Sequence, residues 1–562
     1  DVSVKSMLGV TQVTAALSAG IAVGGSAGSN LAFEGAVVYN GLDNDVKAAI
    51  AASEITGANT VSVRAKDIKP ADAEAAPYQD LLGSYAANKS FAENRGIAVD
   101  GKEYYENIDT SSTGLSSEER GGNGAQGVDA VDLSDNGKTG STIVGAAFVV
   151  AGSDNAAGAA VNIADIDNDF AATIGRGAQI EAGSTIVGAD ADTLLINAAG
   201  GVAAGKDKFG GMGTVTWQNL DNDVFANIEQ SAITTDILAV KAENSALNVN
   251  VGGQVAYGGK AGVGAVLAYN ALDNTVGSYV KGSTISAENT ADGSVIEVEA
   301  VNESAVYGIG ASVAASPKAA ISGTVVINRG GSNTEAVIDQ YSDDTITQAG
   351  SITDVNHLGV RALDRTKRTA VVGNVSASGK VAVGAGIAYN DIGGASADTS
   401  AASQNTLAQI NDTSITTAGE NAAIDLHAED TSELLTIGVG IGGAGNVAVQ
   451  GAAAAALVNK TVEASITNAE IDREAAKNAE VSVRADSDSD ILTVAAVLAV
   501  SKEASIGAAA SVNRIEQDTK AFVSSGSLNL QNLELAADSA ADILNVSIGG
   551  AGAMNVAIAG NA

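Results

Sequence analysis

The residues best suited to chemistry in this chain are acidic side chains in short clusters. Asp43 and Asp45 lie in an LDND sequence that recurs as IDND at 166–169 and LDND at 220–223, and a DSDSD sequence occupies 486–490. Because Ca²⁺ takes several oxygen ligands, structural calcium is one interpretation of these clusters. Their spacing is not that of an EF-hand loop, however, and Asp and Asn are expected in tight turns, where they bond to nearby backbone groups. We therefore favour turn chemistry and predict no metal ligand and no cofactor.

The remaining residues give little support to catalysis. The chain has only two histidines, His357 and His427, and they fall at different places in otherwise similar strand sequences. We expect both on strand surfaces, and the acid near His427 does not by itself indicate a Ser-His-Asp triad. Glycine-rich sequences such as 438–443 lie in alternating strands and not at helix starts, so they do not indicate nucleotide binding. We predict no enzyme, no catalytic residue and no cofactor-binding residue.

Composition limits both the class of protein and its partners. The chain has 562 residues, of which 66 are Gly, 3 are Pro and none is Cys, and its net charge is −36. Disulfides and thiolate metal sites are thereby excluded. The acidic charge disfavours nucleic acid and anionic membranes as partners. Small and β-branched residues replace the large side chains of a conventional core, which suits closely stacked strands.

One uncharged segment, 434–459, is long enough to cross a membrane. It contains several Gly, two Asn and a Gln, and its first half alternates with period two. This composition favours a strand, a turn and a second strand over a transmembrane helix. We therefore expect this part of the chain not to span a membrane.

A repeat of about 55 residues is the most informative feature of the sequence. In each unit a β-forming residue precedes an Asn or Gln, and an Asn-Asp pair or a similar pair follows. The second residue of that pair stands at 45, 169, 223, 275, 334, 406, 461 and 519. One long step contains a loop insertion at 393–404, and the longest contains about 70 extra residues. Flanking sequences such as VSVRAKD at 61–67 alternate apolar and polar residues, which is typical of half-buried strands.

Short strands that cannot bury an apolar face alone do so by stacking on the equivalent strands of the next unit. We therefore predict an all-β fold, an elongated parallel β-helix (β-solenoid) built from about eight degenerate units of roughly 55 residues, with one irregular insertion. We expect Asn at the corners to bond to its equivalent in the next coil. With roughly 20–28 residues per coil and about 4.8 Å between coils, the rod would be on the order of 100–130 Å long. The number of coils per unit stays open.

Segment 66–140 interrupts this pattern, since it contains two of the three prolines and many charges. We divide the chain into a first solenoid unit (1–65), an inserted loop or excursion (66–140) and continuous solenoid repeats (141–562). The excursion is expected to project from the rod, either for recognition or as solvated decoration. The chain begins and ends inside the repeat, which suggests a fragment of a longer protein, with open ends available for self-association.

The units at 439–471 and 481–490 resemble leukotoxin-type filamentous adhesins and, more loosely, filamentous-haemagglutinin-like secreted β-helix exoproteins. The resemblance covers nearly the whole chain except 66–140. It rests on the pattern of the repeated units and not on a catalytic motif. It implies a bacterial extracellular or cell-surface rod that mediates attachment or cell-cell contact through a receptor or glycan on a host or neighbouring cell. The alternative is a self-assembling extracellular filament or surface-layer subunit. A polysaccharide-active β-helix enzyme is less favoured, because the acids are spread out and aromatic residues make up only 3% of the chain.

Overall fold

The computed structural model describes residues 1–22, 30–67, 140–287, 294–343, 346–394, 404–418, 421–473 and 478–562. In this part of the chain every regular element is a β-strand, and all strands except the antiparallel pair β13–β14 belong to one parallel system. The predicted all-β parallel solenoid is therefore confirmed. The strands are β1 (Val2–Leu8), β2 (Thr11–Ile21), β3 (Leu31–Ile50), β4 (Glu54–Asp67), β5 (Ser141–Ile174), β6 (Gln179–Glu229), β7 (Ala232–Gly258), β8 (Ala261–Lys281), β9 (Thr284–Ser286), β10 (Val295–Ser316), β11 (Ala319–Arg329), β12 (Ser332–Asp339), β13 (Tyr341–Ser342), β14 (Thr347–Gln348), β15 (Gly350–Val355), β16 (His357–Ser378), β17 (Val381–Ile392), β18 (Gln404–Asn411), β19 (Thr413–Thr417), β20 (Asn421–Ala444), β21 (Val447–Thr467), β22 (Glu470–Arg473), β23 (Asn478–Ser501), β24 (Ala504–Ser524), β25 (Ser527–Asn529), β26 (Asn532–Gly552) and β27 (Val556–Asn561).

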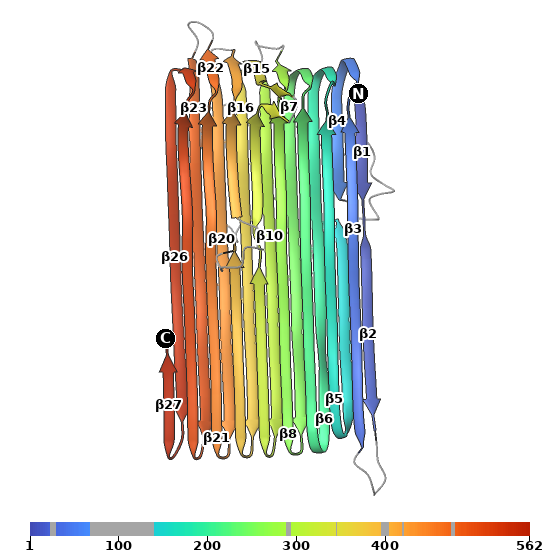
Figure 1. Ribbon diagram of the computed structural model, residues 1–562, viewed down its shortest axis with the longest axis vertical. Coiled ribbons are helices and arrows are strands. Elements are labelled where there is room, and N and C mark those ends of the chain that lie inside the picture. The colour runs from blue at the N-terminus through green and yellow to red at the C-terminus, as the bar shows by residue number, and fades with distance from the viewer. Residues whose placement is uncertain are drawn as a thin grey trace.

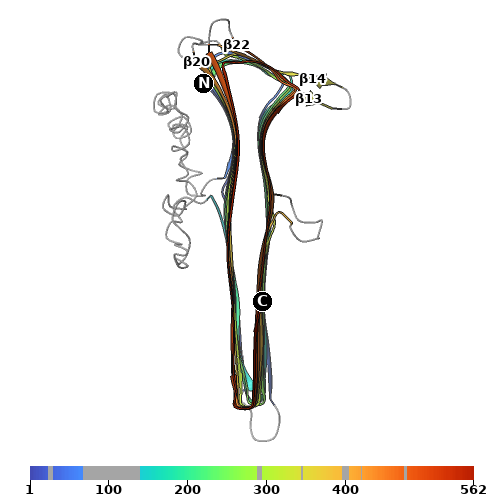
Figure 2. The same ribbon diagram turned by 90° about the vertical axis from the view of Figure 1, so that its left-hand side faces the viewer.

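Each coil is a long, flat loop with three sides (Figure 2). In one coil, β10 runs down the first sheet, a turn at 317–318 reverses the chain, and β11 and β12 run up the second sheet. β15 then crosses the upper end and leads into β16, which pairs with β10. The two sheets lie close together along the lower part of the coil and separate toward the upper end (Figure 2).

The strand register shows that one sequence repeat forms one coil. Val298 pairs with Val240 on one side and with Val360 on the other, and these partners are a whole repeat away in the sequence. The complete ladder at this position is Val4, Val63, Val187, Val240, Val298, Val360, Leu426, Val483 and Leu535. The expected coil of 20–28 residues is therefore wrong, because the chain runs straight where several short strands were expected. These nine rungs give a stack of roughly 40 Å at the usual strand spacing, and the longest dimension lies along the strands (Figure 1).

The wide upper end of the coils contains the main hydrophobic core. Val360, Ile410 and Ile415 come from the three sides of one coil and are completely buried in the same cluster. Equivalent Val, Ile and Leu residues continue this cluster through the neighbouring coils. Because each such side chain contributes about 1.5–3 kcal/mol when it is buried, this core is the principal source of stability for the stack.

The lower part of the coils has an interior of small and polar side chains. Asn270 donates to Asn328 at 2.6 Å and Asn328 donates to Asn390 at 2.8 Å, and all three side chains are fully buried. Thr324 on the second sheet donates to the carbonyl oxygen of Gly373 on the first sheet at 3.2 Å. Hydrogen bonds along the stack and across it therefore hold the two sheets together where little apolar volume is available.

The predicted bonding between equivalent Asn residues is thus confirmed, but the predicted corner position is wrong. Asn270, Asn328 and Asn390 lie inside or at the end of straight strand segments and point inward. The LDND and DSDSD sequences are likewise parts of strands and not turns, since 42–45 lies within β3 and 486–490 within β23. Neighbouring coils supply the backbone hydrogen bonds that a turn would otherwise provide, so Asn can point inward while the flanking Asp residues point outward.

The structure also shows where the two predicted insertions leave the solenoid. β4 ends at Asp67, whose carboxylate accepts hydrogen bonds from the backbone N–H and the hydroxyl of Ser141 at 3.0 and 2.9 Å. The neighbouring strand β6 passes this point without interruption. The ends of the predicted excursion 66–140 therefore meet within one strand position, although residues 68–139 lie outside the described residues. The second predicted insertion, 393–404, follows the same rule. Ile392 pairs with Val458 and Gln404 pairs with Lys460, so a single residue of the next coil, Asn459, corresponds to residues 393–403, of which 395–403 lie outside the described part.

Candidate functional site

A row of buried polar side chains runs through the stack where the lower part meets the upper core. Asn44 donates to Asn168 and Asn168 donates to Asn222 along the second sheet, at 2.6 and 2.8 Å. The row then crosses to the first sheet and continues with bonds of 2.8–2.9 Å. We call this row the polar seam; its members are Asn44, Asn168, Asn222, Asn244, Asn302, Asp364, Asp430 and Lys460.

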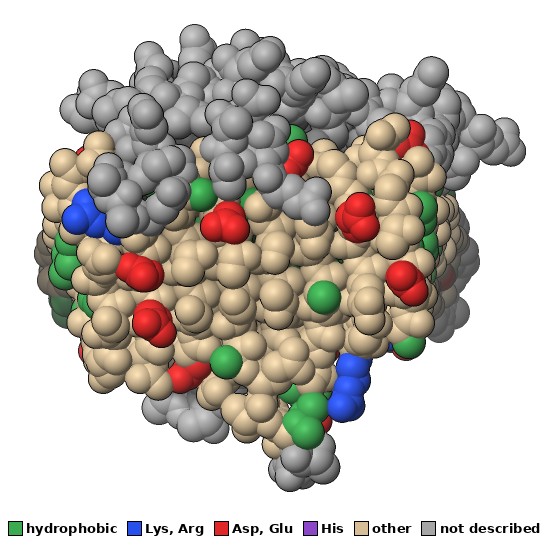
Figure 3. All heavy atoms as spheres, turned by 90° about the horizontal axis from the view of Figure 1, so that it is seen from above, with side chains coloured by type: hydrophobic (Ala, Val, Ile, Leu, Met, Phe, Trp, Pro, Cys, Tyr) green, Lys and Arg blue, Asp and Glu red, His purple; other side chains and the backbone are tan. Residues whose placement is uncertain are grey.

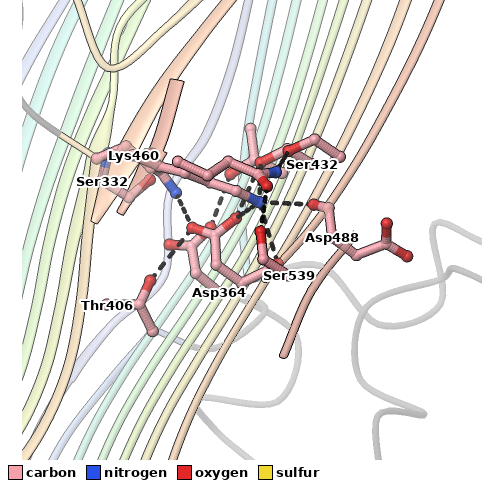
Figure 4. A network of polar contacts seen from close by, with 12 residues as sticks. Ser332, Asp364, Thr406, Ser432, Lys460, Asp488 and Ser539 are labelled. Carbon is pink, nitrogen blue, oxygen red and sulfur yellow. Dashed lines mark hydrogen bonds and ion pairs between the residues drawn. The ribbon is translucent and has the colours of Figure 1, made fainter. Parts of the chain in front are cut away.

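The polar seam ends in a buried ion pair (Figure 4). Lys460 Nζ lies 2.7 Å from Asp430 Oδ1, and both side chains are fully shielded from solvent. The ammonium group also donates to the backbone oxygens of Asp430 and Asp488, at 3.1 and 2.6 Å. The second carboxylate oxygen of Asp430 accepts hydrogen bonds from Gln404 at 2.9 Å and Thr406 at 3.2 Å. The pair is therefore well compensated, which buried charges require.

Asp364 lies one rung from Asp430 and accepts hydrogen bonds from Asn302, Thr334 and Thr366. Burial, and then the charge of Asp430, raise the pKa of Asp364 to about 6. Since Asp364, Asp430 and Lys460 are enclosed between the two sheets, a substrate in solution does not reach them. The ion pair between Asp430 and Lys460 joins β20 of the first sheet to β21 of the second, so we assign it a structural role.

The acidic clusters form outward rows on the second sheet. One row consists of register partners Asp43, Asp167, Asp221 and Asp273, and the next contains Asp45, Asp169 and Asp223. Burial and the surrounding carboxylates raise the pKa of Asp221 to about 7. Among the described residues, no group of three or more acidic or histidine side chains is arranged to hold a metal ion. The carboxylates in these rows therefore repel one another, and the raised pKa of Asp221 reflects this repulsion together with burial.

We predict that Asp221→Asn stabilises the protein at pH 8. The folded-state pKa of Asp221 is raised above its unfolded value, so ionisation of this group lowers stability progressively as pH rises from about 4 to about 7. Because Asp221 is partly exposed, we expect a gain of only roughly 0.5–1 kcal/mol in the free energy of unfolding. Urea titrations at pH 8 and pH 4 should show this gain at pH 8 and its loss at pH 4. Asp425→Asn, whose register partners Gly359 and Ser482 are uncharged, is the matched control and should change little.

The two histidines are not at the strand surface, contrary to the sequence-based expectation. His427 is 3% exposed and its Nε2 lies 2.8 Å from Asp486 Oδ2, whereas His357 Nε2 lies 3.4 Å from Glu297 Oε1. His427 and Arg484 hold the pKa of Asp486 below its usual value, in spite of the opposing effect of burial. The carboxylate partners come from neighbouring coils, so burial of these histidines follows from the stacking and was not visible in one unit.

The outer faces of the lower part are apolar, which reverses the usual arrangement. On both sheets, every second residue points outward across nine residues of each strand, and none of these outward residues is charged. Only Thr369 and Asn155 among them have polar, non-aromatic side chains. Phe148, Trp217 and Leu498 are 46%, 42% and 49% exposed. We call this surface the apolar belt; it comprises alternate residues of 13–21, 144–152, 196–204, 249–257, 307–315, 369–377, 435–443, 492–500 and 544–552 on the first sheet and of 31–39, 155–163, 209–217, 261–269, 319–327, 381–389, 447–455 and 504–512 on the second.

Comparisons with protein-family models, with curated proteins and with solved structures find no match to this chain. In the described part of the chain, no helix is long and apolar enough to cross a membrane.

Sequence reasoning missed the two features that define the lower part. Lys460 occupies the position where adjacent coils have Gln404 and Gln517, so its departure from the repeat was a signal for a special interior contact. The apolar belt was hidden because alternation shows that two faces differ but does not show which face points inward. Only the strand register places Asn and Gln inside and Val, Ile and Leu outside.

Proposed function

We propose that this chain is a non-catalytic, extracellular attachment protein of the adhesin type, which contacts the surface of a host or neighbouring cell through its outer faces. The observation that carries the proposal is the apolar belt. Each coil repeats the same outward chemistry, so the belt forms two continuous surfaces and not scattered single residues. The buried ion pair and the Asn222–Asn244 hydrogen bond of the polar seam join the two sheets that carry these surfaces.

The size of the belt supports an attachment role. Nine residues along each strand and eight strands across give each face an area on the order of 1,000 Å². The largest apolar patch of a typical soluble monomer is only about 300–600 Å² and often functions in binding. Exposure of an apolar surface of this extent to water is energetically unfavourable. Because the surface continues through eight coils, we propose that it contacts another surface.

Adhesion of coated beads tests the proposal. Beads that carry the purified chain should adhere to animal or bacterial cells well above the level of albumin-coated beads. Equal adhesion of both kinds of bead would contradict the attachment function. Electron microscopy of the same dilute sample should show separate short particles; long polymers formed without another protein would favour the filament alternative instead.

A further inference from the structure

We infer that the partner of the apolar belt is a lipid bilayer, into whose hydrocarbon layer the lower part of the solenoid inserts with its tip turns leading. This inference rests on the proposed attachment function and names the surface to which the chain attaches. Segment 434–459 would enter this layer as parts of strands β20 and β21 and not as a transmembrane helix. Four properties of the lower part support the inference: its height, the aromatic row at one edge, the lysines of its tip turns and the hydrogen bonds of its interior.

The height of the belt matches a bilayer. Nine strand residues at about 3.3 Å each span roughly 30 Å, which is the usual thickness of the hydrocarbon core. On both sheets, the outward positions are uncharged over at least nine residues of every strand that forms the belt, while Glu34 lies at an inward position of β3.

Aromatic side chains occupy four of the eight register positions at the upper edge of the belt on the second sheet. Tyr39, Trp217, Tyr269 and Tyr389 occupy one outward row at its upper edge, and the rings of Trp217 and Tyr269 stack with centroids 4.0 Å apart. The acidic rows follow directly above this row on the same sheet. Trp and Tyr are enriched where a membrane protein passes from hydrocarbon to water. The order apolar, aromatic, acidic is therefore the order expected across one bilayer interface.

Charge is distributed so that it favours insertion of the tip. The described turns at the lower end contain six exposed lysines and only three acids, whereas the acidic residues dominate the upper end, as the view from above shows (Figure 3). The tip lysines are Lys206, Lys208, Lys260, Lys318, Lys380 and Lys502. Cationic groups are attracted to lipid phosphates, and long lysine side chains extend readily to a polar interface. The strongly acidic upper part stays in water.

Several polar groups in the interior of the lower part have internal hydrogen-bond partners, which a hydrocarbon environment favours, although both side-chain polar atoms of Asn374 lack one. Gln450 donates to the carbonyl oxygen of Ile441 at 3.0 Å and to the hydroxyl of Ser376, and Asn250 donates to Asn270 at 2.7 Å. Backbone groups of each inner coil pair with the coils on either side. Face-to-face packing of a second copy would also cover the belt, but it would not explain the aromatic row or the basic tips.

Vesicle binding by the full chain tests this inference. Phosphatidylcholine vesicles are used as the probe, and the chain should float with them in a density gradient. Trp217 is the only tryptophan, so its fluorescence reports on one border of the belt. We expect a blue shift on binding and quenching by brominated lipids. A chain that stays at the bottom of the gradient with unchanged Trp217 emission overturns the inference, including the case in which light scattering shows that it has formed a dimer.

Two charge-introducing variants separate the lipid inference from the attachment function. Val255 and Ile321 lie in the belt on opposite sheets and are 42% and 48% exposed, so Val255→Lys and Ile321→Lys should fold in water. A lysine inside the hydrocarbon should weaken vesicle binding roughly 30-fold or more. Thr461→Lys, which adds the same charge to the upper part of the second sheet, should bind like the unmodified chain. If both belt variants bind vesicles normally, the lipid inference is wrong; if coated beads adhere to cells while vesicles are not bound, attachment stands and lipid is not the partner.

Discussion

Lys460→Gln should lower the free energy of unfolding by about 3 kcal/mol at pH 8. The substitution removes the only ammonium group that compensates the fully buried carboxylate of Asp430 in the contacts described above. Breaking a buried ion pair by removal of one partner typically costs about 3–5 kcal/mol, because an uncompensated charge is left behind. Urea titrations followed by far-ultraviolet circular dichroism at pH 8 measure the effect.

The double variant Lys460→Gln with Asp430→Asn is the control for this prediction. It gives the coil the amide chemistry that neighbouring rungs already use, since Gln404 and Gln517 pair with Lys460 in register and Asn302 lies in the row of Asp364 and Asp430. Most of the lost stability should therefore return. If the single variant is as stable as the unmodified chain, Lys460 does not hold the two sheets together.

Gly308→Val should destabilise the lower part by about 3 kcal/mol. Gly308 is buried on β10 and faces the second sheet, and a Cβ atom there would lie 2.5 Å from Asn328 Oδ1 and 2.9 Å from Asn270 Nδ2. Because those two amides bond to each other at 2.6 Å, a valine side chain would separate them and leave buried polar groups unpaired. Overpacking of a close-packed interior adds to this cost. Thermal unfolding measured by circular dichroism should show a clearly lower midpoint.

Gly323→Val is the control for Gly308→Val, because it introduces the same side chain at an outward position of β11. Gly323 lies in the apolar belt, and a Cβ atom at this position meets nothing within 4 Å. Since β-branched residues favour strands, we expect a change within about 0.5 kcal/mol. The reverse order of effects, with Gly323→Val more damaging than Gly308→Val, would mean that the inside and the outside of the lower part have been exchanged.

The repeat length and the parallel stacking could be predicted from the sequence, because each unit carries strand alternation and an Asn that recurs at the repeat period. The length of a coil could not. Asn, Asp and Gly usually favour turns, so sequences such as LDND indicated corners within each unit. In the solenoid the neighbouring coil satisfies the backbone, and Asn44 bonds to Asn168 without a turn. A local signal for a turn was therefore overridden by contacts with residues one repeat away.

The candidate site was harder to predict for a related reason. His427 and Asp486 are far apart in the sequence and meet only because β20 and β23 are adjacent in the stack. Asp430 and Lys460 meet across the two sheets of a coil. Contacts of both kinds depend on the register and on the path of the coil, and neither quantity is contained in the alternation of a single unit.

Oxidation of engineered cysteine pairs tests the central claim, that one repeat forms one coil, most directly. The chain has no cysteine of its own. Val255 and Val313 are register partners in adjacent coils, whereas Val375 lies one further coil away. At about 4.8 Å per coil, only adjacent partners fall within disulfide reach. The pair Val255→Cys with Val313→Cys should form an intramolecular disulfide, and Val255→Cys with Val375→Cys should stay reduced; a disulfide only in the second pair would contradict the register on which the whole account depends.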